Sequence, residues 1–314
     1  LMLISCVKPK DKRQEANELI KEEKFEKALI AINKAIELEP DSISNYTIRI
    51  IIYDATGRFE EEIADLTKII ELDRNGKLVD AYHQRAVVRT LLGYNEQALT
   101  DIDYYINSCS TDTMCNLAEA FLNKASIYYK LNNLKKAKEF YELTIKENNG
   151  QNNNIESQAL VGLANLTMLP QDALKIINEA LKIDDKSSIA YGARAALYLD
   201  SFGKVDEALN DLKKAIMLNP KDAVLYFNMG QLYTNYRNQL DSAVVFFNKA
   251  IELSPQSPDN ELVFMNLAVI SHRKGNLGKA IAEFKKAESI NSENDLLLYN
   301  YAMALSDLGN ETEA

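Results

Sequence analysis

Residues 264–287 read FMNLAVISHRKGNLGKAIAEFKKA, and this stretch decides the fold. Ala280 and Ala287 are seven residues apart, close to two helical turns, so both lie on one face of a helix. Small side chains at such positions let a neighbouring helix approach closely. The same pair, or a substitute for it, returns about every 34 to 39 residues. The first position holds Ala28, Glu62, Ala98, Ala137, Ala173, Ala208, Ala243, Ala280 and Ala314, and the second holds Ala35, Ile69, Tyr105, Thr144, Ala180, Ala215, Ala250 and Ala287.

A second amphipathic stretch precedes each pair, followed by a short break that often carries glycine. The glycines are Gly57, Gly93, Gly203, Gly275 and Gly309. Glycine suits the end of a helix because it adopts positive φ at little cost. Pro40, Pro220 and Pro255 follow the second helix of their units and prevent its continuation. Self-similarity at this period predicts an all-α fold, an α-solenoid of about eight to nine helix-turn-helix units.

The chain resembles the tetratricopeptide repeat proteins, whose units follow the order large, Leu, small, Gly, aromatic, Ala, aromatic, Ala. The eighth unit carries this order at Phe264, Leu267, Ala268, Gly275, Leu277, Ala280, Phe284 and Ala287. The seventh unit matches at Tyr226, Gly230, Tyr233, Ala243, Phe247, Ala250 and Pro255. The resemblance extends from about residue 10 to the end of the chain, so it covers nearly every unit.

The predicted organisation places units one to four in residues 13–147 and units five to nine in residues 155–314. Between them lies a polar, Asn-rich run, residues 148–154, which we expect to be an exposed loop and a bend or sub-boundary. The second and fifth units are poorer matches, with Glu62 in the alanine column and Pro170 expected to open a helix at its first position. Ala314 falls on the alanine column of a truncated ninth unit, so we expect the open reading frame to continue.

The N-terminus reads LMLISC and does not begin with methionine. Leu3, Ile4, Ser5 and Cys6 resemble the lipobox of a bacterial lipoprotein signal peptide. That resemblance implies that residues 1–5 are a signal remnant, that Cys6 carries the lipid, and that residues 6–12 are a tether. It also implies an exported, Bacteroidetes-like lipoprotein on the outer membrane, facing the periplasm. The alternative is a chance match in a cytoplasmic protein.

Cys109 and Cys115 flank a short segment between the third and fourth units. Exported proteins meet oxidising conditions, and a loop this short can bring the two sulfurs within bonding distance. The alternative is a pair of partly buried free thiols. Neither cysteine has a further Cys or His at ligand spacing, so we expect no metal site.

The composition argues against two other classes of function. A formal charge of −10 disfavours nucleic-acid binding, which relies on Lys and Arg to neutralise phosphates. The chain has two histidines, His83 and His272, separated by about five units, and no phosphate-binding loop or hydrolase motif. We therefore expect a non-enzymatic protein with no cofactor, and no apolar run is long enough to span a bilayer.

The resemblance implies that the first helix of each unit lines a concave face. The columns that point into it hold Gly192 and Ala196 in the sixth unit, then Phe227, Gln231, Met265, Val269, Tyr299 and Met303 in the seventh to ninth units. The C-terminal half of this groove is apolar, and we expect it to bind a peptide or helix of a partner protein. The alternative is that these residues are ordinary core.

The same columns argue against one class of ligand, a peptide bound by its C-terminal carboxylate. They lack the Lys and Asn set with which family members clamp a peptide carboxylate. The favoured function is a lipid-anchored scaffold for protein partners, and a homodimer is a further expectation. The alternatives are the ligand-binding region of a longer signalling protein or an accessory region of a downstream enzyme.

Overall fold

The computed structural model describes residues 8–109 and 115–309, and these residues form α-helices and connecting turns without a strand. The helices are α1 (Pro9–Lys21), α2 (Phe25–Leu38), α3 (Ile43–Thr56), α4 (Phe59–Leu72), α5 (Asp80–Leu91), α6 (Asn95–Ser108), α7 (Leu117–Lys130), α8 (Leu134–Asn148), α9 (Asn153–Asn165), α10 (Pro170–Ile183), α11 (Ser188–Phe202), α12 (Val205–Leu218), α13 (Ala223–Asn235), α14 (Leu240–Leu253), α15 (Asn260–Arg273), α16 (Leu277–Ile290) and α17 (Asp295–Leu308). The chain forms two compact blocks, an N-terminal block of Leu1–Asn133 and a C-terminal block of Leu134–Ala314.

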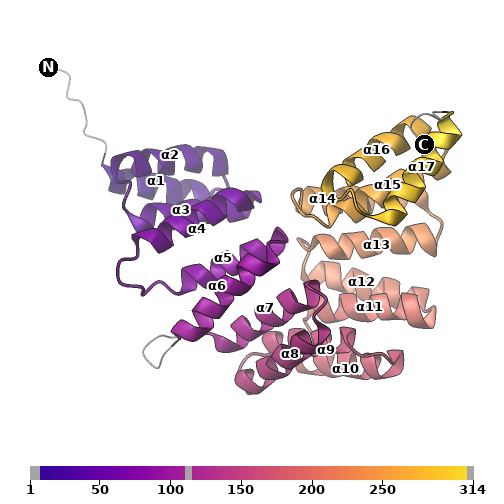
Figure 1. Ribbon diagram of the computed structural model, residues 1–314, viewed down its shortest axis with the longest axis horizontal. Helices are drawn as coiled ribbons and strands as arrows, with labels where there is room; N and C mark the ends of the chain where they lie inside the picture. Colours follow the sequence, from indigo (N-terminus) through magenta and orange to yellow (C-terminus); the bar gives the residue numbers. More distant parts are fainter. Residues whose placement is uncertain (1–7, 110–114, 310–314) are drawn as a thin grey trace. The chain divides into compact units, whose positions relative to one another are not determined.

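Within each block, helices that follow one another pack as hairpins, which can be traced in Figure 1. We call the odd-numbered helices first helices and the even-numbered helices second helices. The N-terminal block contains the hairpins α1/α2, α3/α4 and α5/α6, and the C-terminal block contains α9/α10, α11/α12, α13/α14 and α15/α16. Within a block each hairpin packs on the next, as α2 does on α3 and α12 on α13. The predicted all-α solenoid is therefore confirmed.

The alanine columns form the interior of the hairpins. Ala28, Ala98, Ala208, Ala243 and Ala280 are fully buried on the second helices. The substitutes that the sequence carries in these columns are buried as well: Glu62, Ile69, Tyr105 and Thr144 are each at most 6% exposed. The periodicity therefore marked the contact face correctly even where alanine is absent.

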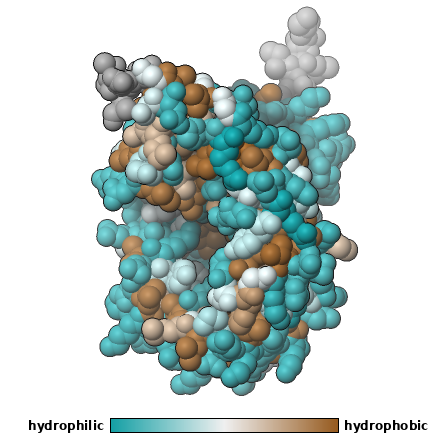
Figure 2. Space-filling model, turned by 90° about the vertical axis from the view of Figure 1, so that its right-hand side faces the viewer, coloured by the Kyte–Doolittle hydropathy of each residue, from teal (hydrophilic) through white to brown (hydrophobic). Residues whose placement is uncertain are grey.

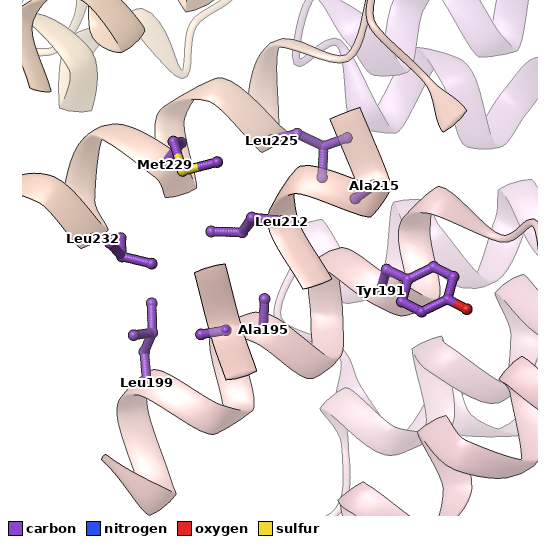
Figure 3. Packing of buried hydrophobic residues seen from close by; sticks show 9 residues of the cluster. Tyr191, Ala195, Leu199, Leu212, Ala215, Leu225, Met229 and Leu232 are labelled. Atoms are coloured by element: carbon purple, nitrogen blue, oxygen red, sulfur yellow. The ribbon is translucent and has the colours of Figure 1, made fainter. Parts of the chain in front are cut away.

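A close-up of the sixth and seventh repeats shows how this interior is filled (Figure 3). Leu199 of α11, Leu212 of α12 and Leu232 of α13 point toward one another and belong to one buried cluster. Leu212 and Leu232 are fully buried. Burying a leucine side chain contributes roughly 1.5–3 kcal/mol relative to exposing it. Each cluster joins one hairpin to the next, so the core is continuous through the block.

Two glycines have conformational or packing roles that the sequence pattern requires. Gly203 ends α11 with φ of +63°, in the left-handed region that other residues rarely adopt. Gly230 of α13 lies against the ring of Phe247, and a Cβ atom there would come within 2.6 Å of the ring. Glycine is thus the residue that allows α13 and α14 to approach this closely.

Three first helices carry an arginine that ties two repeats together. Arg194 of α11 donates two hydrogen bonds to Asp211 of α12, at 2.7 and 2.9 Å, and a third to Asn178 of α10 at 2.8 Å. The same arrangement links Arg49 with Asp65 and Asn33, and Arg85 with Asp101 and Thr67. Each arginine thus binds its own hairpin and the second helix of the preceding one.

The Asn-rich run, residues 148–154, forms a hydrogen-bonded connection between α8 and α9 inside the C-terminal block. The two blocks divide between Asn133 and Leu134 and not at this run. Asn148 is buried, donates to Glu156 at 3.0 Å and accepts from the backbone of Asn152 at 3.1 Å. The side chain of Asn152 caps α9. These bonds hold α8 against α9, which explains why an Asn-rich segment is not a boundary here.

Candidate functional site

Some first helices of the C-terminal block pack against one another as well as against their own second helices. Helix α11 contacts both α9 and α13, and α15 contacts α17, so successive first helices approach one another directly. Helices that approach more closely on one side of a stack make that side concave. This is the arrangement in which a groove along the first helices can receive a ligand.

A cavity of about 570 Å³ opens among α9, α10, α11 and α13. Its walls combine polar groups with apolar side chains, which include Val161, Ile177, Ile189, Leu197 and Val224. Ligand pockets in proteins are commonly of roughly 300–1,000 Å³, so this volume suits a small molecule or a few side chains of a peptide. Gly192 and Ala196, which the sequence places in the groove columns, line it.

An exposed apolar column runs along the first turns of the first helices. Its members are Ile189 (41% exposed), Val224 (56%), Leu262 (38%) and Leu296 (57%). Each lies three residues before a predicted groove position, which is nearly one helical turn, so it shares that face. These four residues are not among the predicted groove positions, although the sequence carries an apolar residue at this place in four successive repeats.

The six predicted groove residues fall into two classes. Phe227, Met265 and Val269 are half-buried and pack against core clusters, with the rings of Phe227 and Phe247 5.8 Å apart between centroids. Gln231 is half-buried as well.

Tyr299 and Met303 are 64% and 44% exposed. Both alternatives for these columns therefore hold in part. Phe227, Met265 and Val269 contribute to the core, whereas Tyr299 and Met303 present exposed surface.

Exposed apolar side chains gather in patches. The face in Figure 2 is mostly hydrophilic, with hydrophobic side chains collected in separate areas between the polar ones. Contiguous apolar surface of this kind marks interaction sites more often than scattered single residues do.

Polar groups follow the apolar column on the same helix faces. Asn228, Asn266 and Asn300 lie four residues after Val224, Leu262 and Leu296, and Asn228 lines the cavity. Amide side chains carry both donors and an acceptor. The face therefore offers apolar contact and hydrogen bonding side by side.

Two carboxylates border the cavity, Asp200 of α11 and Asp222 before α13. Asp222 caps α13 by accepting the backbone N–H of Val224 at 3.0 Å. Its burial raises the pKa of the carboxyl above its usual value, and the backbone N–H bonds oppose that rise. Asp200 is exposed at the rim.

The cysteines and the N-terminus complete the set of predicted sites. Cys109 and Cys115 are paired as a disulfide, with their Cα atoms 5.9 Å apart. Cys6 lies outside the described residues, so its lipidation stays a prediction.

Neither histidine belongs to a cluster of catalytic groups. His83 stacks on Tyr105 and makes a 2.8 Å hydrogen bond with Asn123, and its burial lowers the pKa of the imidazole. His272 contacts Asp307 at 2.7 Å. Among residues 8–109 and 115–309, no group of His, Cys, Asp or Glu could hold a metal ion. The described helices also include none that is both long and apolar enough to cross a membrane.

The architecture defines the class of protein: an α-solenoid of helical hairpins. Family models identify several segments of the chain as tetratricopeptide repeats. The model described as "Tetratricopeptide repeat" matches residues 14–42, 118–149, 223–257 and 263–294, and one described as "TPR repeat" matches residues 201–235. The chain therefore contains tetratricopeptide repeats, as the sequence pattern predicts.

Two longer known proteins are similar in sequence to parts of this chain. The chain is 27% identical over 207 residues to the Hsp70-Hsp90 organizing protein of Triticum aestivum, covering 63% of this chain and 33% of that protein. It is 32% identical over 91 residues to serine/threonine-protein phosphatase 5 of Homo sapiens, covering 29% of this chain and 18% of that protein. The chain thus spans about a third of the first relative and less than a fifth of the second.

Among solved structures, a tetratricopeptide repeat protein from Parabacteroides merdae is similar, with a TM-score of 0.60 at 20% identity. The similarity covers 83% of this chain and 98% of that one. Likeness at this identity establishes the shared fold.

Proposed function

We propose that the protein is a non-enzymatic scaffold that binds a peptide or helix of a partner protein on the first helices of its C-terminal block. One observation carries this: the exposed apolar column Ile189, Val224, Leu262 and Leu296 repeats on four successive first helices. A repeated apolar position fits an elongated partner that contacts each repeat in turn.

The neighbouring residues support the same function. Tyr299 and Met303 extend the exposed apolar surface on α17, and the asparagines Asn228, Asn266 and Asn300 run beside the column. Aromatic residues and methionine are favoured at protein interfaces. Amide groups can pair with the backbone of a bound peptide.

Panning a random peptide library displayed on phage against the purified chain tests the proposal. Val224→Asp, Leu262→Asp and Leu296→Asp alter exposed side chains, so we expect folded proteins that bind the selected peptides about tenfold more weakly. Val245→Asp is the matched control, because Val245 is 66% exposed on the second helix α14. If the control weakens binding as much as the three groove variants do, the groove is not the binding surface.

We further propose that Cys6 carries a lipid that anchors the chain to the outer membrane, facing the periplasm. The support is the lipobox pattern of Leu3, Ile4, Ser5 and Cys6, directly before a polar segment. Mass spectrometry of the protein purified from its native membranes tests it. Unmodified Cys6 or an uncleaved N-terminus would contradict the anchor and favour the cytoplasmic alternative.

Two other settings for the same repeats are the ligand-binding region of a signalling protein and an accessory region of an enzyme. The similarity to part of serine/threonine-protein phosphatase 5 supports the second, because similar repeats belong to an enzyme there. Sequencing the complete gene separates these settings, since an adjoining catalytic domain would favour an accessory region. Light scattering of the chain tests the expected homodimer.

A further inference from the structure

The charged residues that line the cavity of the C-terminal block are all negative. Of the residues that line it, Asp200 and Asp222 are charged, and none is Lys or Arg. The remaining walls are apolar or carry uncharged polar groups such as Thr167, Ser201 and Asn228. A ligand that fills this space therefore meets apolar contacts and two carboxylates.

These two carboxylates lack the ion pairs that three other aspartates of the same block form. Asp206, Asp211 and Asp241 each form an ion pair with a cation of the chain, namely Arg237, Arg194 and Lys274. In the described part of the chain, Asp200 and Asp222 have no ion-pair partner; Asp222 is bonded to backbone N–H groups of α13. Their negative charge thus remains available to a ligand.

From this charge complementarity we infer that the cavity binds a basic, apolar peptide segment, in which aliphatic side chains alternate with lysine or arginine. This inference rests on the proposed peptide-binding function and specifies the chemistry of the partner. The aliphatic side chains contact Ile189, Leu197 and Val224, while a basic side chain lays its methylenes along the same wall and places its charge near Asp200 or Asp222.

An acidic segment is disfavoured by the same geometry. Asp222 is already partly desolvated, and a second carboxylate placed against it would add like-charge repulsion. A lysine or arginine instead supplies the counter-charge that the site lacks. The cavity therefore selects a peptide by the sign of its charge as well as by its shape.

Fluorescence anisotropy with three labelled, amidated peptides tests the inference on the full chain. The probes share one leucine-rich sequence and carry lysine, glutamine or glutamate at the alternate positions. We expect the lysine peptide to bind most tightly, and its affinity to fall as salt is added.

Charge-removing variants then locate the site. Asp200→Asn and Asp222→Asn together are expected to weaken the lysine peptide about threefold to tenfold, and asparagine at position 222 still caps α13. The matched control is Glu179→Gln with Asp185→Asn, since both residues are exposed and neither lines the cavity. Ala196→Leu, which fills part of the cavity, should weaken binding by a comparable factor. Circular dichroism verifies that each variant remains folded.

The outcomes separate this inference from the function on which it rests. If the glutamine or glutamate peptide binds at least as tightly as the lysine peptide and Ala196→Leu weakens it, the groove binds peptides but the basic preference is overturned. If the lysine peptide binds and neither the paired Asn variants nor Ala196→Leu affects it, the cavity is not its site. If none of the peptides binds and phage panning also fails, both the inference and the proposed function are overturned.

Discussion

Glu62 provides the sharpest test of the physical reasoning, because a carboxylate occupies a position that other repeats give to alanine. It is 5% exposed on α4, and its Oε2 atom is buried without a hydrogen-bond partner in the described structure. Burial, with a smaller contribution from the charge of Asp54, raises the pKa of Glu62 from 4.5 to about 7. At about 1.4 kcal/mol for each pH unit between these values, the ionised form costs on the order of 3 kcal/mol.

The sign of the effect follows from proton linkage. Between pH 4.5 and about 7, the folded state holds a proton on Glu62 that the unfolded state has released, so stability falls as pH rises through this window. Above it, the folded chain buries a carboxylate at full cost. Below it, both states are protonated and the penalty disappears.

Glu62→Gln keeps the volume of the side chain and removes the charge. We expect it to stabilise the α3/α4 hairpin by up to about 3 kcal/mol near pH 8, and the gain to vanish below about pH 4.5. Hydrogen exchange of α3 and α4 amides, corrected for intrinsic rates, measures the local opening free energy of this hairpin. Thermal unfolding of the full chain at the same pH values gives an independent measure.

Glu71→Gln is the control, since Glu71 is exposed on the same helix and should change stability little at either pH. Glu62→Ala restores the residue typical of the column and should also stabilise the hairpin at high pH. A gain from Glu62→Gln of equal size at high and low pH would refute the desolvation argument. So would no gain at pH 8.

Two further predictions concern packing in the C-terminal block. Asp211→Ala leaves Arg194 without its bidentate partner and should lower the free energy of unfolding by about 3 kcal/mol. The double variant Arg194→Met with Asp211→Leu should recover most of that loss. Chemical denaturation of the unaltered chain and the two variants measures both effects, and an additive loss in the double variant would contradict the reasoning. Gly230→Ala places a methyl group 2.6 Å from the Phe247 ring and should cost about 1–3 kcal/mol, while Gly278→Ala, with open space around it, should be neutral or gain about 0.5 kcal/mol. Equal melting temperatures for these two glycine variants would show that α13 and α14 can separate without cost.

Only part of the candidate site could be anticipated from the sequence, because none of the six predicted groove residues Phe227, Gln231, Met265, Val269, Tyr299 and Met303 lines the cavity. Gly192 and Ala196 were placed in the groove columns and do line the cavity. Phe227 and Met265 stand at equivalent positions, yet they pack against core clusters because their larger side chains reach neighbouring second helices. Repeat register gives the direction of a side chain, whereas its length and neighbours determine whether it remains exposed.

The sequence by itself determined the helices, their pairing and the buried face of each hairpin, because contacts between neighbouring helices impose a periodicity that can be read along the chain. Even the exceptional Glu62 was located by that periodicity. The tertiary structure alone decided three other matters: the burial that leaves Glu62 unpartnered, the Arg194, Asp211 and Asn178 bonds across two repeats, and the cavity bordered by Asp200 and Asp222. Each of these depends on how closely atoms of different helices approach, and sequence spacing does not contain those distances.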